Sequence, residues 1–166
     1  MAVFGLPAAH EDDALRAVRA AAEFALALAS LNEDLQHRRG IRLELHDRVG
    51  ERIDLPDHSV DAVISSLVLC SVGDPARVLA EIRRILRPGG RYSFVEHVAA
   101  PAGSPTRVLQ RMLRRPWAWT FEGCSCERDL DRIIRAAGFA TVAIEPYRLH
   151  TPFVPFNTHV AGTAHT

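Results

Sequence analysis

The stretch that says most about the fold is residues 51–101, which read ERIDLPDHSVDAVISSLVLCSVGDPARVLAEIRRILRPGGRYSFVEHVAAP. Residues 60–68 are a nearly continuous apolar run, which is typical of a strand covered on both faces. Residues 74–86 repeat apolar side chains at helical spacing and begin with the Asp-Pro pair expected at a cap and first turn. A Pro-Gly-Gly reversal ends that helix, and residues 91–98 return as a strand. This order predicts a unit of an α/β sheet.

The flanking segments extend the same alternation. Residues 11–38 are predicted to form one long helix, because acidic side chains occupy its first turn and apolar side chains recur at helical spacing. Residues 41–46 alternate as a strand does. The remaining expected elements are helices over 104–113 and 127–137, the second stopped by Gly138, and two antiparallel strands over 141–149 and 159–164. We therefore expect an open, mainly parallel α/β sheet.

Composition excludes several classes of function. The 166 residues suffice for one domain, and 20 basic and 20 acidic side chains give a net charge of zero, so we expect no nucleic-acid partner. All the basic residues other than His are Arg, which excludes any lysine-based mechanism. Three cysteines make no disulfide framework, and Cys124-x-Cys126 lacks a second ligand pair, so we expect no metal site. No apolar run reaches the roughly 20 residues of a transmembrane segment. The expected location is the cytoplasm.

Residues 51–163 resemble a class I S-adenosylmethionine-dependent methyltransferase of the type-11 group, which includes thiol S-methyltransferase-like proteins. The resemblance rests on the stretch quoted above, on RRPWAWTFEGC at 114–124 and on FVPFNTHVAG at 153–162. It implies the C-terminal half of a Rossmann-like domain, with S-adenosylmethionine as cofactor. It also implies methyl transfer to a small-molecule acceptor, a thiol or a hydroxyl.

The expected cofactor site lies at the carboxyl ends of the parallel strands, where an α/β sheet places its ligands. By resemblance, residues on two segments would contact the cofactor: Gly50, Glu51 and Arg52 near the adenine ring, and Ser65, Ser66 and Leu67 near the ribose and methionine. The alternative is that these are ordinary turn and strand-end residues.

Glu96 and His97, at the end of a predicted strand, are the best catalytic pair in the chain. The histidine would serve as general base toward a thiol or hydroxyl, since its ordinary pKa lies near neutrality. A histidine that only hydrogen-bonds the following loop is the alternative. The expected acceptor pocket comprises Cys70, Trp117, Trp119 and Phe121, each of which has a plain packing role as its alternative.

Four arginines accompany the two tryptophans of residues 107–119. This basic, aromatic stretch suits a lid over the substrate, a peripheral contact with a membrane surface or a nucleic-acid patch. The zero net charge makes nucleic acid the weakest of the three. A solvated helix face anchored by tryptophan is the plain alternative.

One part of a class I cofactor site is missing from the sequence before Glu51. The family carries a glycine-rich loop, of the pattern E-x-G-x-G-x-G, after its first strand, and those glycines let the backbone approach the cofactor. Residues 1–50 contain only Gly5, Gly40 and Gly50. Catalytic activity is therefore doubtful, and a non-catalytic association module is the alternative function.

The segment before Glu51 resembles a different family. Residues 1–45, with MAVFGLPAAHEDDALRAVRAAAEF at 1–24 and LNEDLQHRRGIRLEL at 31–45, resemble an internal fragment of a bacterial class III adenylate/guanylate cyclase. The flanking metal-site aspartates of that family are lacking. We therefore expect a chimeric chain, a cyclase-like strand–helix segment over 1–47 joined to the later part of a methyltransferase over 48–166. Its incomplete Rossmann-like sheet would expose a strand edge and favour a homo-oligomer.

Overall fold

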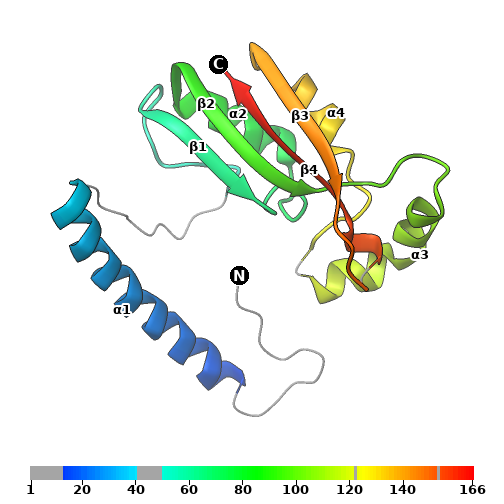
Figure 1. Ribbon diagram of the computed structural model, residues 1–166, viewed down its shortest axis with the longest axis horizontal. Coiled ribbons are helices and arrows are strands. Elements are labelled where there is room, and N and C mark those ends of the chain that lie inside the picture. Colours follow the sequence, from blue (N-terminus) through cyan, green and yellow to red (C-terminus); the bar gives the residue numbers. More distant parts are fainter. Residues whose placement is uncertain (1–12, 41–49, 122, 153) are drawn as a thin grey trace. The chain divides into compact units, whose positions relative to one another are not determined.

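A computed structural model describes residues 13–40, 50–121, 123–152 and 154–166 of the chain (Figure 1). The chain divides into two units, residues 1–47 and residues 48–166. Within the first unit, helix α1 spans Asp13–Arg39 and ends in a basic turn, as the sequence predicts. The strand predicted over 41–46 lies outside the described residues.

The second unit is built on a four-stranded sheet in the order β1-β2-β4-β3 (Figure 1). Its strands are β1 (Val60–Ser66), β2 (Leu86–His97), β3 (Thr141–Arg148) and β4 (Thr158–His165). β1 and β2 run parallel, whereas β4 runs antiparallel to both β2 and β3. The expected antiparallel end of the sheet is confirmed, and β1, β2 and β3 run in the same direction with β4 reversed between β2 and β3. The connection from β3 to β4 holds only a short 3-10 turn, η1 (Val154–Phe156), and is too short for the crossover that parallel strands need.

Helix α2 (Pro75–Ile85) joins the two parallel strands. Its cap is as predicted, because the Asp74 side chain accepts a hydrogen bond from the backbone N–H of Arg77. β2 follows without a break and begins five residues earlier than expected. Leu86 pairs with Val60 and Arg91 with Ala62, so residues 87–90 bulge out of the ladder. The Pro-Gly-Gly reversal therefore lies inside the strand rather than before it.

Two further helices follow β2. Helix α3 (Pro105–Thr120) begins after its Ser104 cap and runs seven residues past the predicted end, through Pro116. The proline lies in the last turns of the helix, where buried Trp117 packs against Phe121 with 4.3 Å between the ring centroids and compensates for the lost backbone hydrogen bond. Helix α4 (Leu130–Ala136) starts later than predicted, because Asp129 caps it, and it stops before Gly138 (φ +81°) as expected.

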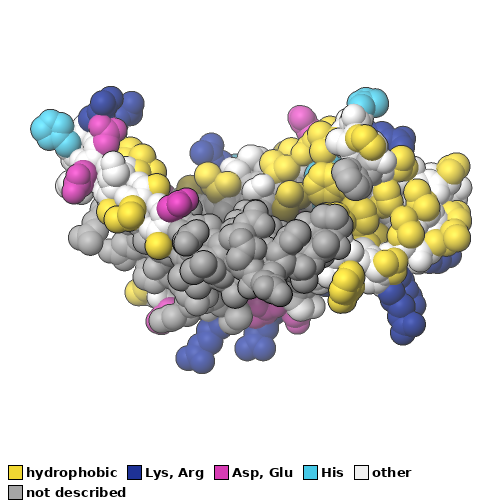
Figure 2. Space-filling model, turned by 90° about the horizontal axis from the view of Figure 1, so that it is seen from below, with side chains coloured by type: hydrophobic (Ala, Val, Ile, Leu, Met, Phe, Trp, Pro, Cys, Tyr) yellow, Lys and Arg dark blue, Asp and Glu magenta, His cyan; other side chains and the backbone are white. Residues whose placement is uncertain are grey.

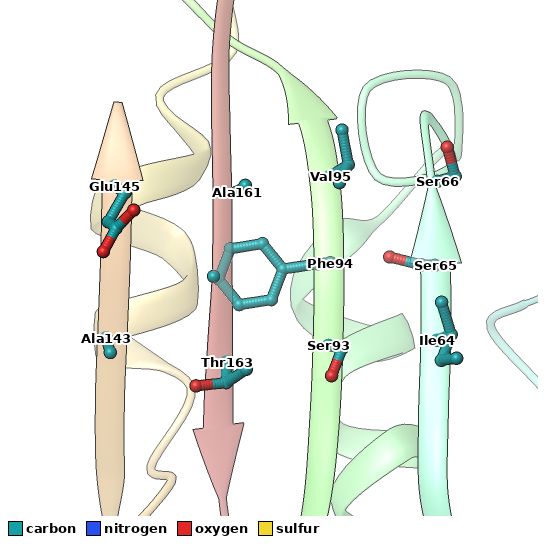
Figure 3. A pocket seen from close by; sticks show the side chains of 11 residues that line it. Ile64, Ser65, Ser66, Ser93, Phe94, Val95, Ala143, Glu145, Ala161 and Thr163 are labelled. Atoms are coloured by element: carbon teal, nitrogen blue, oxygen red, sulfur yellow. The ribbon is translucent and has the colours of Figure 1, made fainter. Parts of the chain in front are cut away.

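The core lies between α2, α4 and one face of the sheet, the inner face (Figure 1). Tyr92 and Phe94 of β2 are buried on this face beside Ala164 of β4. The Phe94 ring reaches over β4 between Ala161 and Thr163 (Figure 3). Phe94 pairs there with Gly162, where a Cβ atom would collide with the Ala143 carbonyl and lie 2.7 Å from the Phe94 ring. Only glycine fits at this crossing.

The opposite face of the sheet, the outer face, is open over the middle of its strands among the residues that the structure describes. Ile64 on β1 is 80% exposed and Val95 on β2 is 37% exposed. Within the same described ranges, no strand pairs with the outer edge of β1. None of the described helices is both long and apolar enough to cross a membrane.

Candidate functional site

The candidate site lies at the edge of the sheet where the parallel strands β1 and β2 end. The chain turns sharply at Leu67, a residue with positive φ (+56°), whose N–H donates to the Val95 carbonyl at 2.8 Å. A loop over 67–73 then leads to the capped start of α2. Because β1 and β2 run parallel, this loop and the residue that ends β2, His97, lie at the same edge.

Glu96 holds that loop from the inside. Its side chain is fully buried, and its carboxylate accepts hydrogen bonds from the Ser65 hydroxyl (2.8 Å) and from the N–H groups of Val68 (3.3 Å) and Leu69 (3.0 Å). The Ser65 proton goes to Glu96, so Tyr92 donates its phenolic proton to the Ser65 oxygen, at 2.7 Å. Burial raises the pKa of the Glu96 carboxyl, against the opposing effect of these hydrogen bonds.

Arg128 hydrogen-bonds to the same loop from its other side. Sequence reasoning missed this arginine. Its guanidinium donates to the carbonyls of Leu69 (2.7 Å) and Val72 (2.6 Å). The N–H of Ser125 also donates to the Cys70 carbonyl, at 2.8 Å. These contacts join segments more than 50 residues apart, and no local pattern around a single arginine would have revealed them.

His97 is buried and its tautomer is determined by its contacts. Nε2 lies 2.8 Å from the Pro155 carbonyl, which only accepts, so Nε2 carries the proton. The lone pair of Nδ1 then faces the Cys124 sulfur, at 3.5 Å. Burial lowers the pKa of His97 and favours the neutral ring. His97 is therefore a neutral acceptor beside a thiol.

The thiols of Cys124 and Cys70 interact next to that ring. The interaction with Cys70 lowers the pKa of Cys124 to about 7, and the same interaction, with burial, raises the pKa of Cys70. Cys126 stays apart, with its sulfur against the Gln110 carbonyl at 3.4 Å. All three cysteines are buried and free. No group of three metal-ligating side chains is found within the described ranges.

An aromatic cluster surrounds His97. Its ring centroid lies 5.2 Å from Phe156, 5.5 Å from His159 and 6.0 Å from Trp117. Trp117 in turn contacts Phe121. His159 sits on β4 directly opposite His97, and its buried Nδ1 has no hydrogen-bond partner in the described part of the chain. Sequence reasoning missed His159.

The remaining predicted residues divide between this edge and other places. Glu51 accepts a hydrogen bond from the N–H of Asp74 at 3.2 Å, which brings Gly50, Glu51 and Arg52 beside the start of α2. Ser66 is exposed at the end of β1, whereas the buried Ser65 hydroxyl donates a hydrogen bond to Glu96. Trp119 is 81% exposed and does not join Trp117 and Phe121.

A shallow hollow on the outer face adjoins this edge (Figure 3). It encloses about 410 Å³ and draws on all four strands, with small or hydroxyl side chains such as Ser66, Ser93, Ala143, Ala161 and Thr163. Ser66 is the predicted cofactor residue whose side chain is exposed beside it. The hollow is open, and its floor is the backbone and small side chains of the sheet.

Comparison with known proteins agrees with the fold. The family described as "Methyltransferase domain" matches residues 13–94. The chain resembles the thiol S-methyltransferase TMT1B of Rattus norvegicus, at 39% identity over 110 residues covering 66% of this chain and 45% of that protein. It is 35% identical to TMT1A of Homo sapiens over 65% of this chain and 44% of that protein.

The fold itself is shared with a solved structure of lower identity. A methyltransferase from Thermotoga maritima, described as a possible histamine N-methyltransferase, superposes with a TM-score of 0.56 at 18% identity, over 79% of this chain and 68% of that one. The chain is therefore similar in sequence to a methyltransferase domain over residues 13–94, and it shares the fold of an S-adenosylmethionine-dependent methyltransferase. It spans less than half the length of these thiol S-methyltransferases. The family match begins at residue 13 and includes α1, and the cyclase resemblance of residues 1–45 stays a prediction.

Proposed function

We propose that the protein transfers a methyl group from S-adenosylmethionine to a small acceptor, and that the acceptor is a thiol. The observation that supports it most is the edge where β1 and β2 end, with its loop pinned by Glu96 and Arg128 beside a buried His97. A loop held from both sides is preorganised for a ligand, which is what an alignment-driven reaction needs. The curated relatives named thiol S-methyltransferases point the same way.

The residues present fit one side of the cofactor. Ser66 offers an exposed hydroxyl at the strand end, and residues 50–52 lie along the adjoining start of α2. Ser65 does not fit the role predicted for it, because its hydroxyl is occupied by Glu96. The bound cofactor supplies an electrophilic methyl carbon, so the chain's own part is to align the acceptor and accept its proton.

The base available at this edge favours a thiol over a hydroxyl acceptor. Burial lowers the pKa of His97, which makes it a weak base. A thiol ionises at a pKa of about 8.5 and needs little help, whereas an alcohol is a far weaker acid. Since the Nδ1 lone pair of His97 faces Cys124, we propose that a proton reaches the ring through that thiol. Glu96 would be a positioning residue, because every hydrogen bond described for its carboxylate holds the protein itself.

Calorimetric titration of the folded chain with S-adenosylhomocysteine tests the cofactor half of the proposal. Saturable one-to-one binding is expected, and Ser66→Ala should weaken it about fivefold by removing one hydrogen bond. Ser93→Ala, on the same face but in the middle of β2, is the matched control and should bind as the wild type does. Absence of heat from a protein shown to be folded would overturn the proposal.

A thiol acceptor screen tests the second half. The cofactor-bound chain should methylate a small aromatic or alkyl thiol faster than the corresponding alcohol. His97→Gln should lower kcat more than it raises KM, because the proposed role of the ring is to accept a proton and not to bind the cofactor. A chain that binds cofactor but methylates only alcohols would contradict the choice of acceptor and leave the cofactor site standing.

A non-catalytic association module is the second candidate, favoured by the outer edge of β1, which has no strand partner in the described part of the chain. Such an edge offers unpaired N–H and C=O groups to another chain. Light scattering across a range of protein concentrations distinguishes the two functions. A concentration-dependent oligomer without cofactor binding would favour the module.

A further inference from the structure

Helix α3 presents a row of large apolar side chains to solvent, which the proposed chemistry does not use. Val108, Met112 and Trp119 are 55%, 74% and 81% exposed. They are spaced four and seven residues apart and therefore share one side of the helix, a surface called here the α3 stripe. Figure 2 shows hydrophobic side chains gathered over the end of the unit that carries α3, with arginines projecting beside them.

The orientation of α3 is determined by its opposite side, so the stripe cannot turn inward. Gln110 is fully buried, accepts from the N–H of Ala100 (2.8 Å) and donates to the carbonyls of Pro155 (3.0 Å) and Val98 (3.3 Å). Trp117 is buried in the aromatic cluster on the same side. These contacts hold the apolar stripe outward, where its exposure costs free energy unless something covers it.

The charges around the stripe indicate what covers it. Residues 105–120 include Arg107, Arg111, Arg114 and Arg115 and no acidic residue. Arg111 pairs weakly with Glu127 at 3.5 Å, and Arg107 donates to the Glu127 carbonyl. Arg114 and Arg115 are exposed and make no ion pair with another described residue. A helix about 24 Å long with an apolar stripe, a tryptophan and flanking arginines has the pattern of an interfacial helix.

We propose that α3 is a membrane-contact helix that lies in the headgroup region of an anionic lipid bilayer. Val108, Met112 and Trp119 would enter the boundary between headgroups and acyl chains. Trp119 suits that boundary because its indole has an apolar body and a polar N–H. The arginines would reach the phosphates with their guanidinium groups while their stems cover apolar surface. This inference does not depend on the proposed methyl transfer.

The proposal is tested by sedimentation of the full chain with vesicles of phosphatidylcholine, with and without phosphatidylglycerol. Binding is expected only to the anionic vesicles, and it should weaken as salt is raised. Met112→Ser with Trp119→Ser should lower the vesicle-bound partition coefficient at least about tenfold, since two apolar side chains no longer insert. Arg114→Glu with Arg115→Glu should do the same for anionic vesicles.

Ile64→Ser is the matched control, because it removes an equally exposed apolar side chain from the outer face of the sheet and not from α3. Its binding should equal that of the wild type. The tryptophan emission should shift to the blue on binding, and Trp119→Phe should abolish that shift while Trp117 remains. No sedimentation of the folded chain with anionic vesicles would overturn the proposal. An equal loss of vesicle binding in Ile64→Ser would also overturn it. So would the finding that substitutions in the α3 stripe leave vesicle binding unchanged and only abolish a concentration-dependent dimer.

Discussion

The inner and outer faces of the sheet are made by the same strands but differ in what covers them. On β2, Tyr92, Phe94 and Glu96 point inward and are buried, whereas Ser93 and Val95 between them point outward and are more exposed. The inner face is closed by α2 and α4, whereas the outer face is open over the middle of the strands and is covered at its His97–His159 end by Trp117 and Phe156. The difference teaches that the core and the geometry of the 67–73 loop depend on the inner face, while the described residues leave the middle of the outer face uncovered.

The substitution expected to have the largest effect removes the Glu96 carboxylate from the inner face. Glu96→Ala should lower the free energy of unfolding by about 3 kcal/mol, because it strands the Ser65 hydroxyl and the N–H groups of Val68 and Leu69 without an acceptor. Urea unfolding measures it. A loss below about 0.5 kcal/mol would mean that the loop is held mainly by Arg128 and not from the inner face.

A pair of neighbouring substitutions on β4 compares the two faces directly. Gly162→Ala adds a methyl group on the crowded inner face, against Phe94 and the Ala143 carbonyl, and should cost about 2 kcal/mol of unfolding free energy. Ala161→Val, one residue away, enlarges a side chain on the open outer face and should change it by less than about 0.5 kcal/mol. Thermal unfolding of both variants decides. Equal losses would show that the outer face is covered in solution.

The smallest expected effect is a pH dependence of the free energy of unfolding, which arises from Glu96 on the inner face. Burial raises the pKa of Glu96 in the folded state, so folding favours its protonated form. That contribution is fully present below the ordinary carboxyl pKa and is lost as the pH rises through the raised value. The free energy of unfolding should therefore fall with rising pH more in the wild type than in Glu96→Gln. Parallel curves for the two proteins would contradict a raised pKa.

Much of the local structure could be predicted from the sequence, for reasons visible in single segments. The Asp74-Pro75 pair and the apolar spacing after it predict α2 to within a residue, and Gly138 ends α4 where expected. The strand order could not be predicted, since it depends on the connection that returns β4 between β2 and β3. The end of α3 was missed because a proline usually ends a helix, whereas here buried Trp117 holds the last turn.

The candidate site was predictable in place but not in role. Parallel strand ends drew attention to residues 65–70 and to Glu96 and His97, and these do meet at one edge. Their tasks depend on partners far along the chain: Arg128 lies 59 residues from Leu69, and Pro155 lies 58 residues from His97. No local pattern encodes such a contact.

By itself, the sequence determined the kind and order of the main helices and strands of residues 50–166, the Asp74 cap, the Gly138 stop and the methyltransferase resemblance, because these depend on periodicity and on neighbours within a few residues. Only the tertiary structure decided that Glu96 faces inward, that the lone pair of His97 faces Cys124, and that Trp117 is buried while Trp119 is exposed. Those outcomes depend on which distant groups close the core around each side chain, and that is a property of packing rather than of local sequence.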